Sequence, residues 1–216
     1  MIGDPVSRGW LVEGRRLKVA FIGTHGVGKT TLCYDLAAHL KRLDFSVDLV
    51  KEVARECPLP INLDTTLDAQ AWILHTQIAR EIAAAERYQA VICDRSVLDN
   101  YAYLVHQVGR VASLEPVLQT WLKTYARLVK VPICAPPTFD GTRDLGQSFQ
   151  VEIDQGIDEL VRAFGVSCLR LEPRDRPGWL RQLLVDLELP LEPPQLGLFN
   201  GEPSERASAG APPEDR

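Results

Sequence analysis

Short apolar runs alternate with amphipathic segments along most of the chain. Five runs have the length and composition of strands buried in a parallel sheet. They cover residues 17–22, 46–52, 90–94, 128–135 and 166–171. Segments with helical spacing of apolar positions lie between and after them, at residues 30–43, 67–86, 97–108, 114–125, 150–164 and 177–187. Strands that alternate with helices predict an α/β fold with a five-stranded parallel sheet, right-handed crossovers and helices on both faces.

The longest predicted helix, residues 67–86, is rich in alanine. Its inner face is expected to be marked by an apolar stripe, namely Trp72, Leu74 or His75, Ile78 and Ile82. Trp72 and Trp121 are interpreted first as core residues, because aromatic side chains at helical spacing usually serve packing. Trp72 is also a candidate to bind substrate by stacking on a base, since ligand pockets are enriched in aromatic side chains.

The two ends of the chain lack this pattern. Residues 1–15 are expected to form an irregular N-terminal arm, and residues 16–189 the folded domain. Residues 190–216 are rich in Pro, Gly, Ser, Ala and acidic residues, which predicts a disordered acidic tail. The N-terminus has no apolar signal region, and no apolar run is long enough to span a membrane. We therefore expect a cytoplasmic protein without a membrane partner.

Charge and cysteine content narrow the choice of function. The net charge is −5, and the tail, with five acidic and two basic residues, carries −3 of it. The remaining body is near −2, which argues against a protein that coats nucleic acid through bulk charge. The five cysteines form no CxxC pair and no zinc-site spacing, and an odd number fits a reducing compartment. Cys93, Cys134 and Cys168 lie in apolar runs and are expected to be buried, reduced thiols.

The segment "GTHGVGKTT" follows the first predicted strand and opens the first helix. Its residues Gly23-x-x-x-x-Gly28-Lys29-Thr30 match the P-loop pattern in full, and a strand before and a helix after are the context this motif requires. The motif predicts a P-loop NTPase fold of three α/β/α layers. Backbone N–H groups of the loop and the helix N-terminus would hold the phosphates of ATP. The residues expected to bind the cofactor are Gly23, Thr24, His25, Gly26, Val27, Gly28, Lys29, Thr30 and Thr31.

Within this loop, Lys29 would reach the β- and γ-phosphates as a catalytic residue, and the Thr30 hydroxyl would join Mg²⁺. The His25 side chain is given no role and is expected to be a solvent-facing spacer.

The third predicted strand ends in "CDRS", residues 93–96. Asp94 is placed to hold Mg²⁺ opposite the P-loop; the alternative is that it caps the next helix, a role we assign to Ser96. Arg95 would point into the mouth of the cleft and clamp a phosphoryl group. A surface ion pair is its alternative.

Two further segments carry candidate residues. Glu52 ends the second predicted strand and could accept a proton from an attacking hydroxyl, with Arg55 beside it on the substrate side. The alternative is that Glu52 pairs with Arg55 or caps a helix. Residues 137–149 form a loop rich in Gly, Pro and Asp whose one basic residue is Arg143. Closure of this loop would bring Arg143 to the transferring phosphoryl group, and a plain surface connection is the alternative.

The segments "GTHGVGKTT", "KEVARE", "CDRSVLDNYAYL" and "DGTRDLGQSF" together resemble the P-loop nucleoside and nucleotide kinases. The nearest resemblance is to the small family that includes the kinase domain acting on nicotinamide riboside and its AAA-domain relatives, and it covers residues 17–187. It implies that Glu52 matches the proposed base of deoxynucleoside kinases, and Asp94-Arg95-Ser96 their acid-Arg-Ser motif. It also implies that Tyr101 or Tyr103 matches a tyrosine of thymidylate kinases.

Two features depart from that pattern. Val53 follows Glu52 where deoxynucleoside kinases usually have proline, and the loop that corresponds to their lid holds only Arg143.

The function predicted from these residues is Mg²⁺-dependent phosphoryl transfer from ATP to a small acceptor, a nucleoside, a nucleotide or a related molecule. The acceptor would lie between Glu52, Arg55, the helix 67–86 and the helix after Asp94. The alternative is an NTP-hydrolysing switch or regulatory ATPase that acts with a protein partner. An Asn-Lys-x-Asp motif for guanine is absent, and the near-neutral body argues against a kinase of nucleic-acid 5′ ends. A homodimer is left open.

Overall fold

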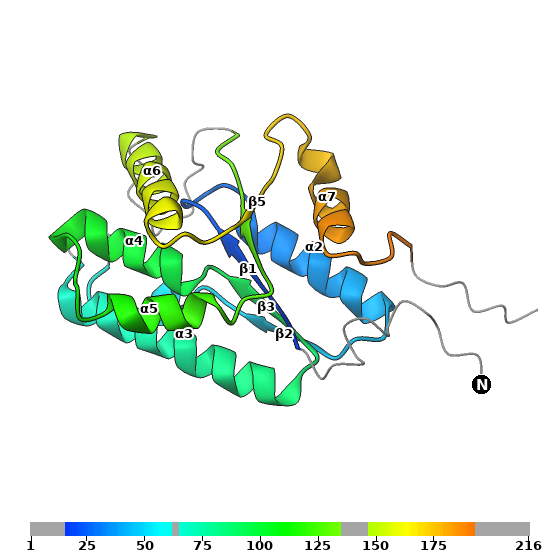
Figure 1. The fold of residues 1–216 in the computed structure, drawn as a ribbon, viewed down its shortest axis with the longest axis horizontal. Helices are drawn as coiled ribbons and strands as arrows, with labels where there is room; N and C mark the ends of the chain where they lie inside the picture. The colour runs from blue at the N-terminus through cyan, green and yellow to red at the C-terminus, as the bar shows by residue number, and fades with distance from the viewer. Residues whose placement is uncertain (1–15, 62–64, 135–146, 193–216) are drawn as a thin grey trace, which may run out of the picture.

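The computed structural model describes residues 16–61, 65–134 and 147–192. Five parallel strands form one sheet in the order β2-β3-β1-β4-β5, and helices cover both of its faces (Figure 1). The strands are β1 (Leu17–Ile22), β2 (Val47–Val50), β3 (Ala90–Asp94), β4 (Arg127–Lys130) and β5 (Leu169–Arg170). The α/β fold with a five-stranded parallel sheet is confirmed.

Six α-helices and two short 3₁₀ helices connect and follow the strands within the described residues. The α-helices are α2 (Lys29–Arg42), α3 (Leu67–Arg87), α4 (Val97–Val108), α5 (Glu115–Leu122), α6 (Gln147–Ala163) and α7 (Trp179–Asp186). The 3₁₀ helices are η1 (Val53–Glu56) and η3 (Arg176–Gly178). In the part of the chain that is described, no helix combines the length and the apolar character needed to cross a membrane.

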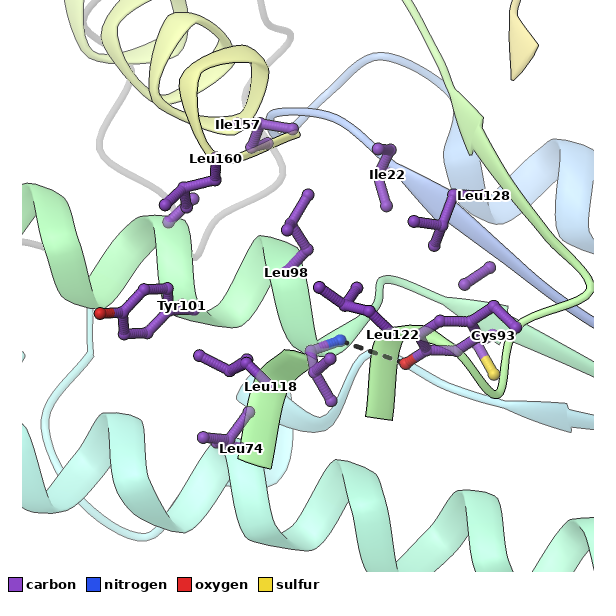
Figure 2. Close-up of a cluster of buried hydrophobic side chains, with 14 of the residues drawn as sticks. Ile22, Leu74, Cys93, Leu98, Tyr101, Leu118, Leu122, Leu128, Ile157 and Leu160 are labelled. Atoms are coloured by element: carbon purple, nitrogen blue, oxygen red, sulfur yellow. Dashed lines mark hydrogen bonds between the residues drawn. The ribbon is translucent and has the colours of Figure 1, made fainter. Parts of the chain in front are cut away.

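The alternation of side chains along β1 builds one core on each face of the sheet. Leu17, Val19 and Phe21 pack with α2 and α7 in one hydrophobic cluster. Ala20 and Ile22 point to the other face, where α3, α4, α5 and α6 supply the second cluster (Figure 2). Because β1 is central and fully buried, the loop that follows it is held rigidly at the carboxyl edge of the sheet. This edge is where open α/β sheets bind ligands.

The inner face of α3 differs from the prediction. Ile82 is 55% exposed, so this assignment was wrong; of the alternatives Leu74 and His75, Leu74 is the buried one. Gln77 and Glu81 are buried instead. The prediction failed because it treated polar side chains as outward-facing, whereas buried polar side chains are accommodated where they are hydrogen-bonded.

Strands β4 and β5 are shorter than predicted. Strand β4 ends at Lys130, and Pro132 beyond it has no N–H with which to continue the pairing. Strand β5 contains only Leu169 and Arg170. As a result Cys134 is exposed and Cys168 is half-buried, which corrects the expectation that both would be buried; Cys93 is buried as expected.

Candidate functional site

The loop between β1 and α2 has the backbone that the P-loop motif requires. Gly23 has φ +144°, and a Cβ atom there would lie 2.7 Å from the carbonyl oxygen of Val131. Gly28 has φ +96° and is the residue from which α2 starts. Both values favour glycine, because side chains are strained at such φ angles. The loop therefore turns tightly into the N-terminus of a 14-residue helix, a favourable position for an anion.

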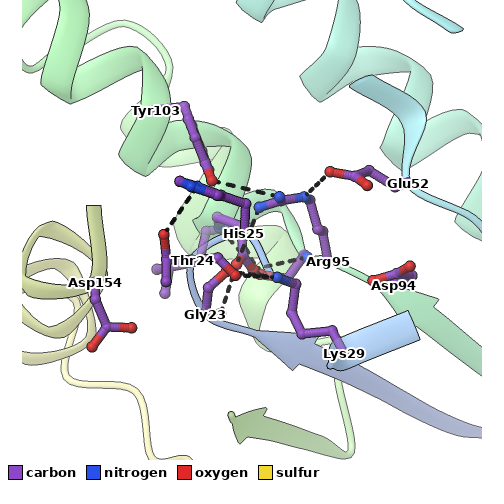
Figure 3. A network of polar contacts seen from close by, with 12 residues as sticks. Gly23, Thr24, His25, Lys29, Glu52, Asp94, Arg95, Tyr103 and Asp154 are labelled. Carbon is purple, nitrogen blue, oxygen red and sulfur yellow. Dashed lines mark hydrogen bonds and ion pairs between the residues drawn. The ribbon is translucent and has the colours of Figure 1, made fainter. Parts of the chain in front are cut away.

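Lys29 lies folded across this loop (Figure 3). Its Nζ donates hydrogen bonds to the carbonyl oxygens of Gly23, at 2.9 Å, and Thr24, at 2.5 Å. Burial, followed by the nearby charge of Arg95, lowers the pKa of Lys29 from 10.5 to about 8. A cation buried in a phosphate loop is poorly solvated by water, so an anion bound there would compensate its charge.

The strand pairing brings Thr30 and Asp94 together. Phe21 of β1 is paired with Asp94 of β3, so the end of β3 lies beside the P-loop. The Thr30 hydroxyl donates to Asp94 Oδ2 at 2.5 Å. A hydroxyl and a carboxylate side by side are the hard oxygen ligands that Mg²⁺ prefers.

No group of three or more His, Cys, Asp or Glu side chains within the described residues could hold a metal. The donor set of Thr30 and Asp94 nevertheless fits the usual mode of Mg²⁺ binding, in which one or two protein oxygens combine with phosphate and water oxygens.

Ser96, not Asp94, caps helix α4. The Ser96 hydroxyl accepts from the backbone N–H groups of Leu98 and Asp99, and Asp99 Oδ2 accepts from the Ser96 N–H at 3.1 Å. These bonds form a complete capping box. The expected capping role of Ser96 is confirmed.

Asp99 was missed by the sequence analysis. Its Oδ1 accepts a hydrogen bond of 2.8 Å from the N–H of Gly23, so Asp99 ties the first residue of the P-loop to α4. Burial raises the pKa of Asp99, while Arg95 and Lys29 act in the opposite direction. The Ser-x-x-Asp spacing of a capping box was the signal that could have identified it.

Glu52 and Arg95 form a buried ion pair beside the P-loop (Figure 3). Arg95 Nε donates to Glu52 Oε1 at 2.7 Å, and Arg55 Nε donates to Glu52 Oε2 at the same distance. Arg95 is 4% exposed, so the expectation that it would stand in the open mouth of the cleft needs correction. It points inward because Glu52 and Asp99 lie there; its Nη1 is 4.0 Å from Asp99 Oδ1.

Arg95 also contacts the ring of Tyr103. The centre of its guanidinium lies 5.0 Å from the ring centroid, and Nη2 is 3.5 Å from the Tyr103 hydroxyl. The Tyr101 hydroxyl instead donates to Glu115 Oε1, away from this cluster. Of the two tyrosines considered from the sequence, Tyr103 is therefore the one that lies at the site.

We expected His25 to be a solvent-facing spacer, and this expectation was wrong. It is buried, and its ring centroid lies 5.8 Å from that of Phe149 on α6. Its backbone oxygen accepts a hydrogen bond of 3.0 Å from Gln150 Nε2. Helix α6 folds back over the P-loop and covers this histidine, a long-range contact that the loop sequence does not reveal.

Two predicted site residues, Trp72 and Arg143, remain. Trp72 is half-buried on α3. Arg143, with most of the loop 137–149, lies outside the described residues, so its role stays a prediction.

Arg176, which the sequence analysis did not single out, lies at the other end of the P-loop. Its Nη2 would be 3.1 Å from a Cβ atom at Gly28. Its position in the segment that follows β5, at the carboxyl edge of the sheet, was the available signal.

Comparisons with known proteins agree with this arrangement. The model of the family described as "AAA domain" matches residues 18–177, which is well over half of the chain. A search of curated proteins finds no match.

Among solved structures, the chain is similar to NadR protein in complex with NR, with 16% identity, a TM-score of 0.67, and coverage of 82% of this chain and 53% of that one. It therefore spans about half the length of NadR. It is also similar to deoxyadenosine kinase from M. mycoides with bound dATP, with 16% identity, a TM-score of 0.57 and coverage of 80% and 100%. Thymidylate kinase from Ehrlichia chaffeensis gives 16% identity, a TM-score of 0.58 and coverage of 80% and 97%.

These likenesses confirm the resemblance seen in the motifs. The chain belongs to the AAA domain family, and its fold is that of the P-loop nucleoside and nucleotide kinases.

Proposed function

We propose that this protein transfers the γ-phosphoryl group of ATP, with Mg²⁺, to a nucleoside, a nucleotide or a related small molecule. The observation that carries the proposal is the buried pair of Glu52 and Arg95 beside the P-loop. Nucleotide binding alone would need only the loop, Lys29 and the Thr30–Asp94 pair. A carboxylate and a guanidinium held together opposite the phosphates are the groups that an acceptor hydroxyl and a moving phosphoryl group require.

On the donor side, the P-loop N–H groups would bind the β- and γ-phosphates, and Lys29 would neutralise their charge. Thr30 and Asp94 would hold Mg²⁺, which would supply positive charge to offset the negative charge that develops during transfer. Arg176, beside Gly28, is placed to contact the nucleotide outside the triphosphate. These groups position and stabilise charge, which is most of what phosphoryl transfer asks of a protein.

On the acceptor side, Glu52 would accept the proton of the attacking hydroxyl, and Arg95 would stabilise the transferring group. Arg95 Nη1 is buried, and no described atom accepts a hydrogen bond from it. A buried donor without an acceptor is costly unless a ligand completes it. The Tyr103 ring, stacked on this guanidinium, limits its motion.

The solved relatives support the substrate class without fixing the acceptor. One is a NadR structure in complex with NR, and the others are a deoxyadenosine kinase with dATP and a thymidylate kinase. Nucleosides and nucleotides are therefore the first acceptors to test.

Replacing Glu52 by glutamine tests the role of this residue. We expect transfer to the acceptor to fall by about 10²–10⁴-fold, the usual contribution of a general base, while affinity for ATP changes little. Steady-state kinetics and calorimetric titration with a non-hydrolysable ATP analogue measure the two quantities. Glu56→Gln is the matched control, because Glu56 ends the 3₁₀ helix that follows Glu52 but pairs at the surface with Arg80. Equal losses of transfer and ATP binding in the Glu52 variant would make this residue structural.

The lowered pKa of Lys29 predicts a pH dependence of nucleotide binding. In the ligand-free protein Lys29 is charged below about pH 8 and loses its proton above it. Phosphate binding favours the charged form, so affinity for ATP should decrease above pH 8, by about tenfold per pH unit at most. Binding at pH 9 should be accompanied by proton uptake, seen by calorimetry in two buffers of different ionisation enthalpy. Constant affinity from pH 7 to 9 without proton uptake would contradict this.

A further inference from the structure

Glu81 is a buried carboxylate on α3 that the proposed reaction does not use. Its side chain is 0% exposed. Oε2 accepts from Lys18 Nζ at 2.9 Å and from Trp121 Nε1 at 2.7 Å. Oε1 accepts from Gln77 Nε2 at 2.8 Å and from the Tyr125 hydroxyl at 2.7 Å. Four donors on four segments of the chain thus meet at one carboxylate, beneath the sheet face that supports the site.

Gln77 and Tyr125, the two partners of Oε1, also form hydrogen bonds with the turn between β3 and α4. Gln77 Nε2 also lies 3.4 Å from the carbonyl oxygen of Arg95, as a second acceptor. The Tyr125 hydroxyl accepts a hydrogen bond of 3.2 Å from the N–H of Val97. One oxygen of Glu81 is therefore linked, through a single side chain in each direction, to backbone groups on both sides of Ser96.

This turn needs external support. Arg95 has φ +89°, a conformation that residues with a side chain rarely adopt. Such strain persists only where surrounding contacts hold the backbone, and it gathers at functional sites. The capping box of Ser96 and Asp99 holds the turn from the α4 side. Gln77 and Tyr125 hold it from below, and both are oriented by Glu81.

The two carboxylate oxygens of Glu81 have different kinds of partner, and this difference points to a specific role for Glu81 beyond core packing. Among the described residues, the partners of Oε2, Lys18 and Trp121, make no hydrogen bond to the turn. Lys18 neutralises the carboxylate, and its Nζ lies 4.4 Å from the Trp121 ring centroid. The partners of Oε1 both contact the turn. A buried ion pair is by itself weak evidence for added stability, because apolar residues of similar volume often do as well.

We propose that Glu81, acting through Gln77 and Tyr125, is a positioning residue that fixes the strained backbone at Arg95 and so aims its guanidinium at Glu52. The effect on Arg95 follows from the contacts alone, whereas the effect on turnover rests on the proposed kinase function. Lys18 supplies the cation that pairs with this buried carboxylate.

The test compares Tyr125→Phe, which removes a link to the turn, with Trp121→Phe, which removes a donor of the same carboxylate on the other oxygen. Full-length protein labelled with ¹⁵N-arginine reports the Arg95 Nε–H by NMR, with Arg95→Lys to assign the signal. Because this N–H is buried and bonded to Glu52, it should exchange slowly with solvent. We expect Tyr125→Phe to shift the signal and lose this protection, and Trp121→Phe to retain both. Gln77→Met, which cuts the other link, is the second test variant.

Kinetics give the second readout. With any acceptor found for the wild-type protein, Tyr125→Phe and Gln77→Met should lower kcat by about 10- to 100-fold, the scale of a misplaced group, with the KM for ATP nearly unchanged. Trp121→Phe should stay near wild type, although all three variants lower Tm. An unchanged Arg95 signal in both test variants, or an equal change in the control, overturns the proposal. If the wild-type protein transfers no phosphate, the NMR comparison still decides the role of Glu81.

Discussion

Replacing Lys29 by alanine is expected to reduce phosphoryl transfer by at least about 10²–10³-fold, the typical loss when one preorganised group that stabilises charge is removed. Lys29 is the buried cation of the P-loop itself, whereas the other buried cation nearby, Arg95, is paired with Glu52. The other lysine of α2, Lys41, lies in the last turn of the helix and cannot take its place. The rate should be measured at saturating Mg·ATP, so that weaker binding is separated from slower transfer.

The fold should survive this change. The charged form of Lys29 is disfavoured by burial, so its removal also removes a desolvation cost. Lys41→Ala is the matched control, because Lys41 is an exposed lysine on the same helix. Circular dichroism and Tm should be close to wild type for both variants, and only Lys29→Ala should lose transfer. Unchanged turnover in Lys29→Ala would refute the assignment of the P-loop.

Replacing Lys18 by methionine is expected to have the largest effect on stability. Its Nζ is the cation paired with the fully buried Glu81, and Met keeps most of the side-chain volume. Removal of one partner of a buried pair leaves an uncompensated charge and costs about 3–5 kcal/mol. In a chain of this size each kcal/mol lowers Tm by about 2–4 °C. Urea unfolding and thermal melts measure the loss directly.

Two further variants show whether the stability lost in Lys18→Met comes from the buried ion pair. Arg16→Met removes the exposed pair of Arg16 and Glu86, and should cost no more than about 1 kcal/mol. Adding Glu81→Gln to Lys18→Met should restore part of the lost stability, because a neutral amide needs no buried cation but keeps an oxygen for Gln77 and Tyr125. A Lys18 variant as stable as the Arg16 variant would show that the buried pair contributes nothing to the fold.

Local signals in the sequence were sufficient to predict the P-loop, the Thr30–Asp94 pair and the helix that follows β3. The P-loop placed Lys29 and Thr30, and Asp94 at the end of a buried strand was placed beside them; the structure brings Thr30 and Asp94 into contact. Helix α4 was predicted from Val97 to Val108, as observed, because Ser96 provides a strong N-cap. These features depend on neighbours within a few residues, which is why the sequence shows them.

What the sequence did not show depends on contacts between distant segments. The burial of Gln77 and Glu81 follows from donors on β1, α5 and the segment before β4, none of which is near them in the chain. His25 is covered by α6, more than a hundred residues later. Arg95 was recognised as a candidate, but its inward direction is set by Glu52 and Asp99. Hydrophobic periodicity assigns polar residues to the surface and cannot anticipate such pairs.

The most direct test of the account is to follow the γ-phosphate of radiolabelled Mg·ATP. Purified protein would be incubated with nucleosides, nucleotides, nicotinamide riboside and an oligonucleotide with a 5′-hydroxyl, each in its own reaction, together with a reaction without acceptor. We expect label on one small acceptor, at a rate well above release of free phosphate, and loss of that product in Lys29→Ala. Label that appears only as free phosphate, at the same rate in every reaction, would contradict the kinase proposal and favour the switch or regulatory ATPase with a protein partner.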